Sequence, residues 1–585
     1  MSTHRRFATP LLLLALAVFV PGAAGAQAHA TDSSAAPPLD PRSFGVREQA
    51  RFESFRRAHL PFSRGASGSR CEEVVGRFCY WYDETAAPVP EPAQTAEARG
   101  RLLVVLDSLV ALNPTDTWLT GQLVRYLDED GKGERALDAA RACKAFGWWC
   151  DALQGFALHR LGRYRDAEHA FDRLLEALPV GERCRWTDIS LYLDEDSRRQ
   201  YQRSSCGSEQ REAFERRTWW LSRVRYGIQG NDSRTEHFAR LTYVEFLRGA
   251  VSAYPFGFDE DERELVLRFG WPDSWSRGPD APMGLGGPAQ LNVVGSEPTP
   301  AYRYIPPHHV LTSPIVSDSI DWAVQLPPVV ARYHPPYAKQ LVMLEHQQAL
   351  FRRGDTALVV LAYDVGDLTA FTGTALEGSL TLSPGGEPRE FETVARDVPA
   401  TGRLTARAPW GPLLMSAEIA APARSALARA RYGVRPPYAV GTRVALSDLL
   451  FYKPYGELPS SVEQAIPHAL STQRVPPDGK LGVYWEVYNT NPSGERLSVS
   501  LTIVPETEEA GFFRRGLQAL RLAKESAPVS LSVEDVSTRG APFTARALEL
   551  DISTLRPGDY LVQLEIGVEG QFVLRTDRRL VVVAP

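Results

Sequence analysis

The sequence lacks the short motifs that mark several well-known enzyme classes. The 585-residue chain contains no G-x-S-x-G, no H-E-x-x-H and no phosphate-binding P-loop. The run "GLGGP" at Gly284–Pro288 has neither the strand and helix nor the spacing of a dinucleotide-binding turn. The sequence therefore gives no support to nucleophilic or nucleotide-dependent catalysis, and we predict no catalytic residue and no cofactor.

Cysteine is absent from the C-terminal half of the chain. The six cysteines all lie in the N-terminal part: Cys71, Cys79, Cys143, Cys150, Cys184 and Cys206. An even number in an oxidising compartment predicts disulfides, and pairing each cysteine with its neighbour along the chain is the simplest arrangement. A structural zinc site is the alternative, but no C-x-x-C pair occurs, so we expect no bound metal.

The chain also lacks a hydrophobic run long enough to span a membrane. Its longest, "LLLLALAVFV" at Leu11–Val20, is shorter than the ~20 residues that a spanning helix needs. Basic residues precede this run, and the small residues Ala24–Ala26 follow it, as in a secretory signal peptide. We therefore predict a signal peptide over residues 1–26 and an exported protein, periplasmic or secreted, without a transmembrane anchor. A signal-anchor helix is the alternative.

Net charge and length restrict the partners and the number of domains. A formal charge of -6 is small for 585 residues, so neither nucleic acid nor an anionic membrane surface is an evident partner. At ~150 residues per domain, the length predicts about four domains.

Residues 27–100 are predicted to be a linker with a short cysteine-bearing segment. Two tracts rich in alanine and proline, 27–45 and Thr85–Ala98, flank the segment "FCYWYDE". We expect its aromatic side chains to dock on a neighbouring domain. An exposed ligand-binding platform is the alternative.

Residues 101–209 show helical periodicity and an internal repeat. Gly155 follows Gly121 by 34 residues. Small, aromatic and proline residues then recur at fixed places: Gly155, Gly162, Ala167, Phe171 and Pro179. This pattern resembles a tetratricopeptide repeat (TPR), in which small residues let two helices approach closely and an aromatic ring fills the gap between them. Fewer than three repeats seldom stand alone, so we expect the following segment to cap them.

Residues 210–275 combine aromatic helices with the stretch "GFDEDERELVLRFGWPD". This combination resembles the GWxTD domain, a bacterial exported domain of unknown activity. The matching positions are Gly257, Phe258, Asp261, Gly270, Pro272 and Asp273, with Phe258 in the place of the family's tryptophan. The resemblance implies a small α+β module but no reaction.

Within this module, the residues themselves predict a helix, an acidic turn and a strand. "SRTE" at Ser233–Glu236 is a capping box, which predicts that a helix begins there. Leu265, Leu267 and Phe269 alternate with other residues as in a strand. The carboxylates of Asp259–Glu262 are consecutive and point in different directions, so we expect a solvated turn; a calcium or catalytic site is the alternative.

Beyond residue 338 the hydrophobic period changes to two. Residues 276–338 are rich in glycine and proline and are predicted to be an irregular connector. Alternating apolar residues then recur at Leu380–Leu382, Leu497–Ile503 and Tyr560–Ile566, with turn sequences between the strands. We predict two antiparallel β-sandwiches of the immunoglobulin (Ig-like) kind, over 339–470 and 471–585.

One histidine cluster could carry metal chemistry: His308, His309, His334 and His346, with Glu345 as a nearby base. It defines the alternative function, a metal-dependent hydrolase of the cell envelope. We favour isolated loop and strand-edge histidines. Paired carboxylates of a glycoside hydrolase stay open, because their separation cannot be read from a sequence.

The sequence thus predicts a multidomain protein with a helical TPR-like N-terminal half, a GWxTD-like module and C-terminal Ig-like sandwiches. Stacked helix pairs form a groove that accepts an extended chain. We therefore expect a non-enzymatic binding or scaffold protein outside the cytoplasm, whose helical part contacts a protein or peptide partner in the cell envelope.

Overall fold

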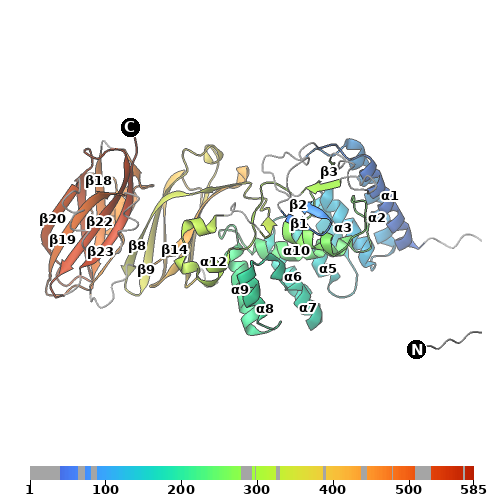
Figure 1. Ribbon diagram of the computed structural model, residues 1–585, viewed down its shortest axis with the longest axis horizontal. Helices are drawn as coiled ribbons and strands as arrows, with labels where there is room; N and C mark the ends of the chain where they lie inside the picture. Colours follow the sequence, from blue (N-terminus) through green and yellow to red (C-terminus); the bar gives the residue numbers. More distant parts are fainter. Residues whose placement is uncertain are drawn as a thin grey trace, which may run out of the picture. The chain divides into compact units, whose positions relative to one another are not determined.

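The chain has a helical N-terminal half and a C-terminal region of several β-sheets (Figure 1). The structure is a computed structural model, which describes residues 40–63, 73–80, 89–278, 293–296, 298–323, 330–386, 391–436, 444–476, 479–506, 529–570 and 573–584. The expected signal peptide (1–26) and Cys71 lie outside these ranges. In the ranges described, no helix is long and apolar enough to cross a membrane.

The helical region consists of the helices α1 (Pro41–Ala58), α2 (Ala93–Leu112), α3 (Thr117–Glu129), α4 (Gly133–Ala142), α5 (Trp149–Arg160), α6 (Tyr164–Ala177), α7 (Val180–Trp186), α8 (Glu195–Gln202), α9 (Glu209–Ser222), α10 (Asp232–Leu247) and α11 (Glu260–Phe269). Helix α1 and the first residues of α2 occupy part of the stretch that was expected to be a linker. Helix α1 buries Phe52 together with the polar side chains Gln49 and Glu53. Because much of the buried face of α1 is polar, its sequence shows only a weak apolar periodicity, and this periodicity is the pattern that predicts a helix.

Helices α5 and α6 pack through the small residue that the sequence pattern singled out. A Cβ atom on Gly155 would lie 2.5 Å from the ring of Phe171, which is fully buried. Glycine at this position therefore lets the aromatic ring of α6 lie against the backbone of α5. Helix α10 is buried along most of its length and contacts α3, α5, α6 and α11, so it forms the centre of the helical region.

Helix α10 begins at Asp232, one residue before the predicted capping box. Asn231 is the N-cap residue, and its side-chain oxygen accepts a hydrogen bond from the amide of Arg234 at 3.0 Å. The Ser233 hydroxyl instead donates to the carbonyl of Ser222 at 2.8 Å. The capping box prediction was therefore wrong, because an asparagine at the preceding turn caps the helix.

Helix α11 replaces the strand expected at residues 265–269. Asp259 caps it, and Gly270 ends it in a left-handed backbone conformation with φ of +97°. The apolar run at its end is contiguous, so it satisfies both a helical and a strand period. Helix α11 buries Val266 and Phe269, three residues apart, which a strand would place on opposite faces.

Two of the three expected disulfides are present. Cys143 is bonded to Cys150, and Cys184 to Cys206. The third expected pair, Cys71 with Cys79, lies outside the part of the chain whose side chains are described. Short elements follow the helical region in the expected connector: β3 (Ser274–Arg277) pairs with β4 (Val293–Ser296), and β5 (Tyr302–Arg303) with β6 (Arg332–Tyr333), with α12 (His308–Thr312) between β5 and β6.

The first β-rich part contains two sheets that share an apolar core. Their strands are β7 (Gln340–Met343), β8 (Glu345–Arg353), β9 (Thr356–Asp364), β10 (Glu377–Pro384), β11 (Phe391–Arg396), β12 (Thr401–Pro409), β13 (Leu413–Ala421) and β14 (Ala426–Val434). One sheet has the order β11-β10-β13-β14-β7 and the other β12-β9-β8. Leu380 and Met415 of the first sheet lie in one buried cluster with Val359 of the second.

The second β-rich part repeats this arrangement. Its strands are β15 (Ala445–Leu446), β16 (Leu450–Tyr452), β17 (Arg474–Val475), β18 (Lys480–Tyr488), β19 (Arg496–Pro505), β20 (Val529–Val536), β21 (Phe543–Asp551), β22 (Gly558–Val568) and β23 (Leu574–Val582), with the short helix α13 (Val462–Ala465). Strands β15, β16 and β21 pair with β18, whereas the second sheet runs β17-β23-β22-β19-β20. The alternating stretches at Leu497–Ile503 and Tyr560–Ile566 are confirmed as strands. Strand β15 joins this part at Ala445, before the expected boundary at residue 470.

Candidate functional site

Two cavities open on the helical region among the described residues. We call them the aromatic groove and the polar pocket. The aromatic groove has a volume of about 270 Å³ and the polar pocket about 150 Å³. They differ in chemistry, so each is described separately.

The aromatic groove is lined mainly by large rings from four segments of the helical region. These rings are Trp118, Phe146, Trp148, Trp149 and Phe246. The indole N–H of Trp118 donates to the carbonyl of Gly249 at 3.2 Å, and that of Trp149 to the carbonyl of Thr117 at 2.8 Å. These two bonds fix the rings and use their polar atoms, and both residues are only 7% exposed, so they form the inner wall of the groove.

Phe146 is the most exposed part of the aromatic groove. Its side chain is 101% exposed and stands on the loop that the Cys143–Cys150 disulfide closes. This large apolar side chain is therefore held in water by a closed loop and contributes nothing to the core. The rim carries both signs of charge, with Arg248 3.3 Å from Glu245 and Arg42 3.7 Å from Asp116.

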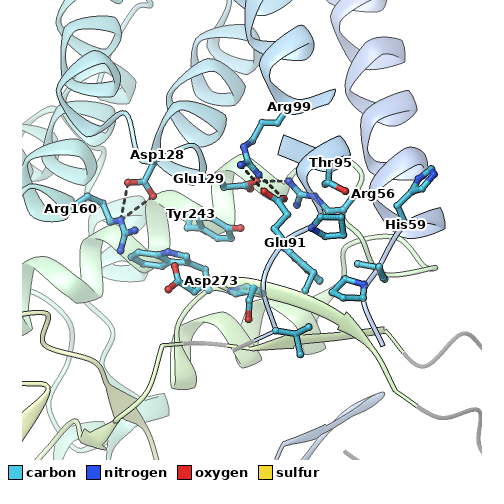
Figure 2. Close-up of a pocket in the computed structure, with 18 residues that line it drawn as sticks. Arg56, His59, Glu91, Thr95, Arg99, Asp128, Glu129, Arg160, Tyr243 and Asp273 are labelled. Atoms are coloured by element: carbon cyan, nitrogen blue, oxygen red, sulfur yellow. Dashed lines mark hydrogen bonds and ion pairs between the residues drawn. The ribbon is translucent and has the colours of Figure 1, made fainter. Parts of the chain in front are cut away.

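The polar pocket lies where the ends of several helices meet (Figure 2). Its charged lining residues are Arg56 of α1, Arg99 of α2, Asp128 and Glu129 of α3, Arg160 of α5, and Glu91 and Asp273 from loops. Tyr243 of α10 lines it together with Trp271 and Trp275, and the rings of Tyr243 and Trp271 stack at 5.3 Å with an interplanar angle of 18°. The pocket thus combines paired charges with aromatic faces.

Each arginine of the polar pocket is paired with a carboxylate. Arg56 Nη2 donates to Glu129 at 2.6 Å. Arg99 makes two bonds of 2.8 Å to Glu91. Arg160 Nε donates to both oxygens of Asp128 at 2.9 and 3.0 Å. These pairs neutralise the three positive charges, so the pocket does not present a free cation to an anionic ligand.

A buried polar network supports the floor of the polar pocket. Arg125 Nε lies 3.2 Å from Glu129, and the Tyr126 hydroxyl donates to Glu53 at 2.6 Å. Burial opposes ionisation of Glu129, but Arg56 and Arg125 hold its pKa below the ordinary value. Burial raises the pKa of Glu53, and the same two arginines only partly offset it. The network therefore keeps Glu129 ionised and orients Arg56.

The residues of the GWxTD-like motif do not form one site. Gly257 is exposed, and Phe258 packs against the helical core. Asp261 forms an ion pair with Arg77, whose guanidinium lies over the ring of Phe256. Gly270 ends α11, and Pro272 and Asp273 line the polar pocket.

The acidic stretch Asp259–Glu262 is not wholly solvated, which corrects the expectation. Glu262 is only 3% exposed, and burial raises its pKa to about 7, with Arg125 acting in the opposite direction and Asp261 adding to the rise. The helix that replaced the expected turn carries Glu262 to its inner face, while Glu260 stays in solvent.

The four histidines have separate partners and do not converge. The amide of His308 donates to Asp194 at 2.8 Å, and His309 lies 3.0 Å from Asp321. His334 is half-buried beside the carbonyl of Phe269, and desolvation lowers its pKa to about 3. His346 contacts the Tyr432 hydroxyl at 2.8 Å. In the part of the chain that the structure describes, no three His, Cys, Asp or Glu side chains are placed to hold a metal ion.

The aromatic residues expected in the core are buried there. Trp219 and Trp220 are each 5% exposed, and Tyr80 stacks on Phe269 at 3.6 Å. Phe78 packs edge-on against Tyr254, so the described part of "FCYWYDE" docks on the helical region as expected. Trp81 and Tyr82 lie outside the described residues.

The polar pocket was missed in the sequence because its residues come from many separate elements. Arginine and glutamate are common on helix surfaces, so their presence in the sequence does not predict that they meet in one pocket. Trp271 and Asp273 were noted only as parts of the motif that ends α11. The aromatic groove had one usable signal, the density of tryptophan and phenylalanine around the Cys143–Cys150 pair.

Comparisons with known proteins assign no family. No model of a protein family matches the chain, and no curated protein sequence matches it. Partial structural similarity is found to red sea bream transglutaminase (11% identity, TM-score 0.14, 42% of this chain and 32% of that chain). A second partial match is Bacteroides uniformis beta-glucuronidase 2 (10% identity, TM-score 0.17, 39% of this chain and 26% of that chain). A third is a DUF3823 family protein from Bacteroides ovatus (7% identity, TM-score 0.15, 36% of this chain and 94% of that chain). This chain thus spans about a third or less of the two enzymes, and TM-scores this low carry no functional argument.

Proposed function

We propose that this chain is a non-enzymatic binding or scaffold protein that acts outside the cytoplasm and contacts a protein or peptide partner through its helical region. The proposal includes export by the N-terminal signal sequence, a TPR-like α5–α6 pair, a GWxTD-like module and Ig-like sandwiches as spacer or second contact. The observation that carries it is the exposed Phe146 beside the aromatic groove. The two disulfides are in keeping with an oxidising compartment.

The chemistry of the aromatic groove favours an extended, proline-rich segment as the partner. Trp118 and Trp149 have their N–H groups bonded to the backbone, so both contribute apolar surface. The rim pairs Arg42 with Asp116 and Arg248 with Glu245, so it selects neither an acidic nor a basic peptide. Aromatic-lined grooves bind proline-rich segments because such segments are already extended and lose little entropy on binding.

No observation on the histidines favours the alternative function, a metal-dependent hydrolase. His308 and His309 lie on α12, whereas His334 follows β6 (Arg332–Tyr333) and His346 lies on β8. Each is held by a different neighbour, as described above. We therefore propose binding without turnover.

The test measures binding of a synthetic polyproline peptide to the full mature chain by tryptophan fluorescence. We expect Phe146→Ser to weaken binding by about tenfold, because a central aromatic contact contributes strongly to an interface. Leu112→Ser is the matched control, since Leu112 is 75% exposed but does not line the groove. Equal binding by wild type and Phe146→Ser, or equal binding of a glycine-serine peptide of the same length, would contradict the proposal.

A further inference from the structure

We propose that the polar pocket binds one sugar unit of an uncharged oligosaccharide. This site is separate from the aromatic groove and does not depend on the function proposed for it. The inference rests on the charge balance of the pocket, on buried polar atoms that lack partners, and on the aromatic faces beside them.

The charge balance argues against an anionic ligand. Arg56, Arg99 and Arg160 are each bonded to a carboxylate of the pocket, as described above. A phosphate or carboxylate would have to compete with these carboxylates for the guanidinium groups. A neutral ligand can instead bond to the remaining donor and acceptor atoms without breaking any pair.

Two residues that line the pocket carry buried polar atoms without partners in the part of the chain that the structure describes. Thr95 and Arg56 are each only 2% exposed, yet Thr95 Oγ1 and Arg56 Nε have no hydrogen-bond partner among the described residues. Figure 2 shows the hydroxyl group of Tyr243 also pointing into the pocket. A buried polar atom left unpaired is destabilising, and an apolar ligand would not change that. A ligand with several hydroxyl groups satisfies them, because each hydroxyl both donates and accepts.

The pocket also offers acceptors beside these donors. Asp128 and Glu129 are fixed by Arg160 and Arg56, and the carboxylate of Asp273 lies at the exposed edge (Figure 2). Neighbouring hydroxyl groups of a sugar ring are spaced so that a carboxylate or a guanidinium group can bond to two of them at once, and such charge-assisted bonds are among the stronger ones.

The aromatic residues and the volume fit one sugar ring. Trp271 stacks on Tyr243, and the guanidinium of Arg160 lies 5.4 Å from the Trp271 ring centre, so the ring is held on both sides. Trp275, which is half-buried and lies outside this stack, offers apolar surface to the C–H face of a sugar, while the polar atoms fix its orientation. The cavity of about 150 Å³ is smaller than the ~300 Å³ of a typical drug-sized site, which restricts the ligand to about one ring.

The test titrates the full mature chain with three neutral trisaccharides, maltotriose, cellotriose and triacetylchitotriose, and with inorganic phosphate. Binding is followed by calorimetry and by tryptophan fluorescence. We expect at least one trisaccharide to bind and phosphate not to bind. Tyr243→Phe and Thr95→Val, which each remove one hydroxyl and keep the shape, should lower its affinity by about fivefold or more.

The matched control is Arg163→Gln, which removes an exposed arginine paired with Glu134 outside the pocket and should leave the affinity unchanged. Asp273→Asn, at an exposed carboxylate, is a second pocket variant that should fold normally and still weaken binding. Phe146→Ser should bind the sugar as wild type does, which separates this site from the groove. Absence of trisaccharide binding at millimolar concentration, binding of phosphate in its place, or equal losses in Tyr243→Phe and Arg163→Gln would overturn the proposal.

Discussion

The guanidinium group of Arg431 stacks on the ring of Tyr226, with its central carbon 3.7 Å from the ring centre. Arg431 belongs to strand β14, whereas Tyr226 follows helix α9, so this contact joins the helical region to the first β-rich part. Glu418 completes the joint by accepting hydrogen bonds from the amides of Tyr226 at 2.8 Å and Gly227 at 2.9 Å. Burial opposes ionisation of Glu418, but Arg431 and these two amides hold its pKa below the ordinary value.

Arg431→Lys should destabilise this joint strongly. Arg431 donates to the carbonyl of Arg223 at 2.8 Å and lies 3.2 Å from Glu418, and lysine cannot make both contacts and stack on the ring. Glu418 would then keep a cation nearby but lose the fixed guanidinium geometry, and the carbonyl of Arg223 would lose its donor, so we expect the free energy of unfolding to fall by about 2 kcal/mol. Urea unfolding measures this change. Arg424→Lys, at an exposed arginine on the turn before β14, is the control, and an equally small effect of both variants would contradict the prediction.

Sequence patterns predicted elements in which one face is buried and the other is in water. The strands β19 and β22 alternate between core and solvent side chains, so their period of two was visible. Gly155 and Phe171 likewise marked a close helix pair, because only a small residue permits that contact. In each case a local pattern reflects a local packing requirement.

Elements whose burial depends on distant partners were not predictable in this way. Helix α1 buries Gln49 and Glu53, which both hydrogen-bond to the hydroxyl of Tyr126 of α3. In the sequence alone, two such polar residues are typical of a helix surface. The polar pocket depends even more on distant contacts, since Arg56 and Glu129 meet only in the folded chain. The sequence does not show whether two charged residues form a buried ion pair or are both solvated.

Glu262 should make the protein less stable as the pH rises through neutrality. Its pKa is about 7 in the folded chain against an ordinary value of 4.5. Between these values the folded state holds more protons than the unfolded state, so this group lowers the free energy of unfolding as pH rises from about 4.5 to 7. Glu262→Gln removes this contribution and should be more stable than wild type by about 2–3 kcal/mol at pH 8, but not at pH 4.5.

Urea unfolding of both proteins at the two pH values checks this expectation. Glu260→Gln, on the exposed side of the same helix, is the matched control for replacing a glutamate of α11 by glutamine. A Glu262→Gln protein that is no more stable than wild type at pH 8 would refute the assigned direction.

Gly155→Ala should destabilise the α5–α6 pair. The added Cβ atom would lie 2.5 Å from the buried ring of Phe171, and overpacking of this kind costs about 1–3 kcal/mol. Gly100→Ala in α2 is the control, because a Cβ atom there meets nothing within 4 Å and alanine favours the helix by up to ~1 kcal/mol. Thermal unfolding should show opposite changes in the two variants, and a neutral Gly155→Ala would mean that Phe171 can move away freely.

The Cys143–Cys150 disulfide should matter more for binding than for stability. The two cysteines are 7 residues apart, and the loop that they close carries Phe146. Replacing both by serine should lower the free energy of unfolding by only about 2 kcal/mol, because a short loop restricts the unfolded chain little. It should nevertheless weaken binding of the polyproline peptide by about tenfold, since the loop no longer holds Phe146 beside the groove.

The pair Cys184–Cys206 spans 22 residues and lies outside the groove, so its removal should cost more stability, about 3 kcal/mol, and leave peptide binding unchanged. Equal losses of binding in the two double variants would show that general destabilisation, and not the position of Phe146, governs the groove.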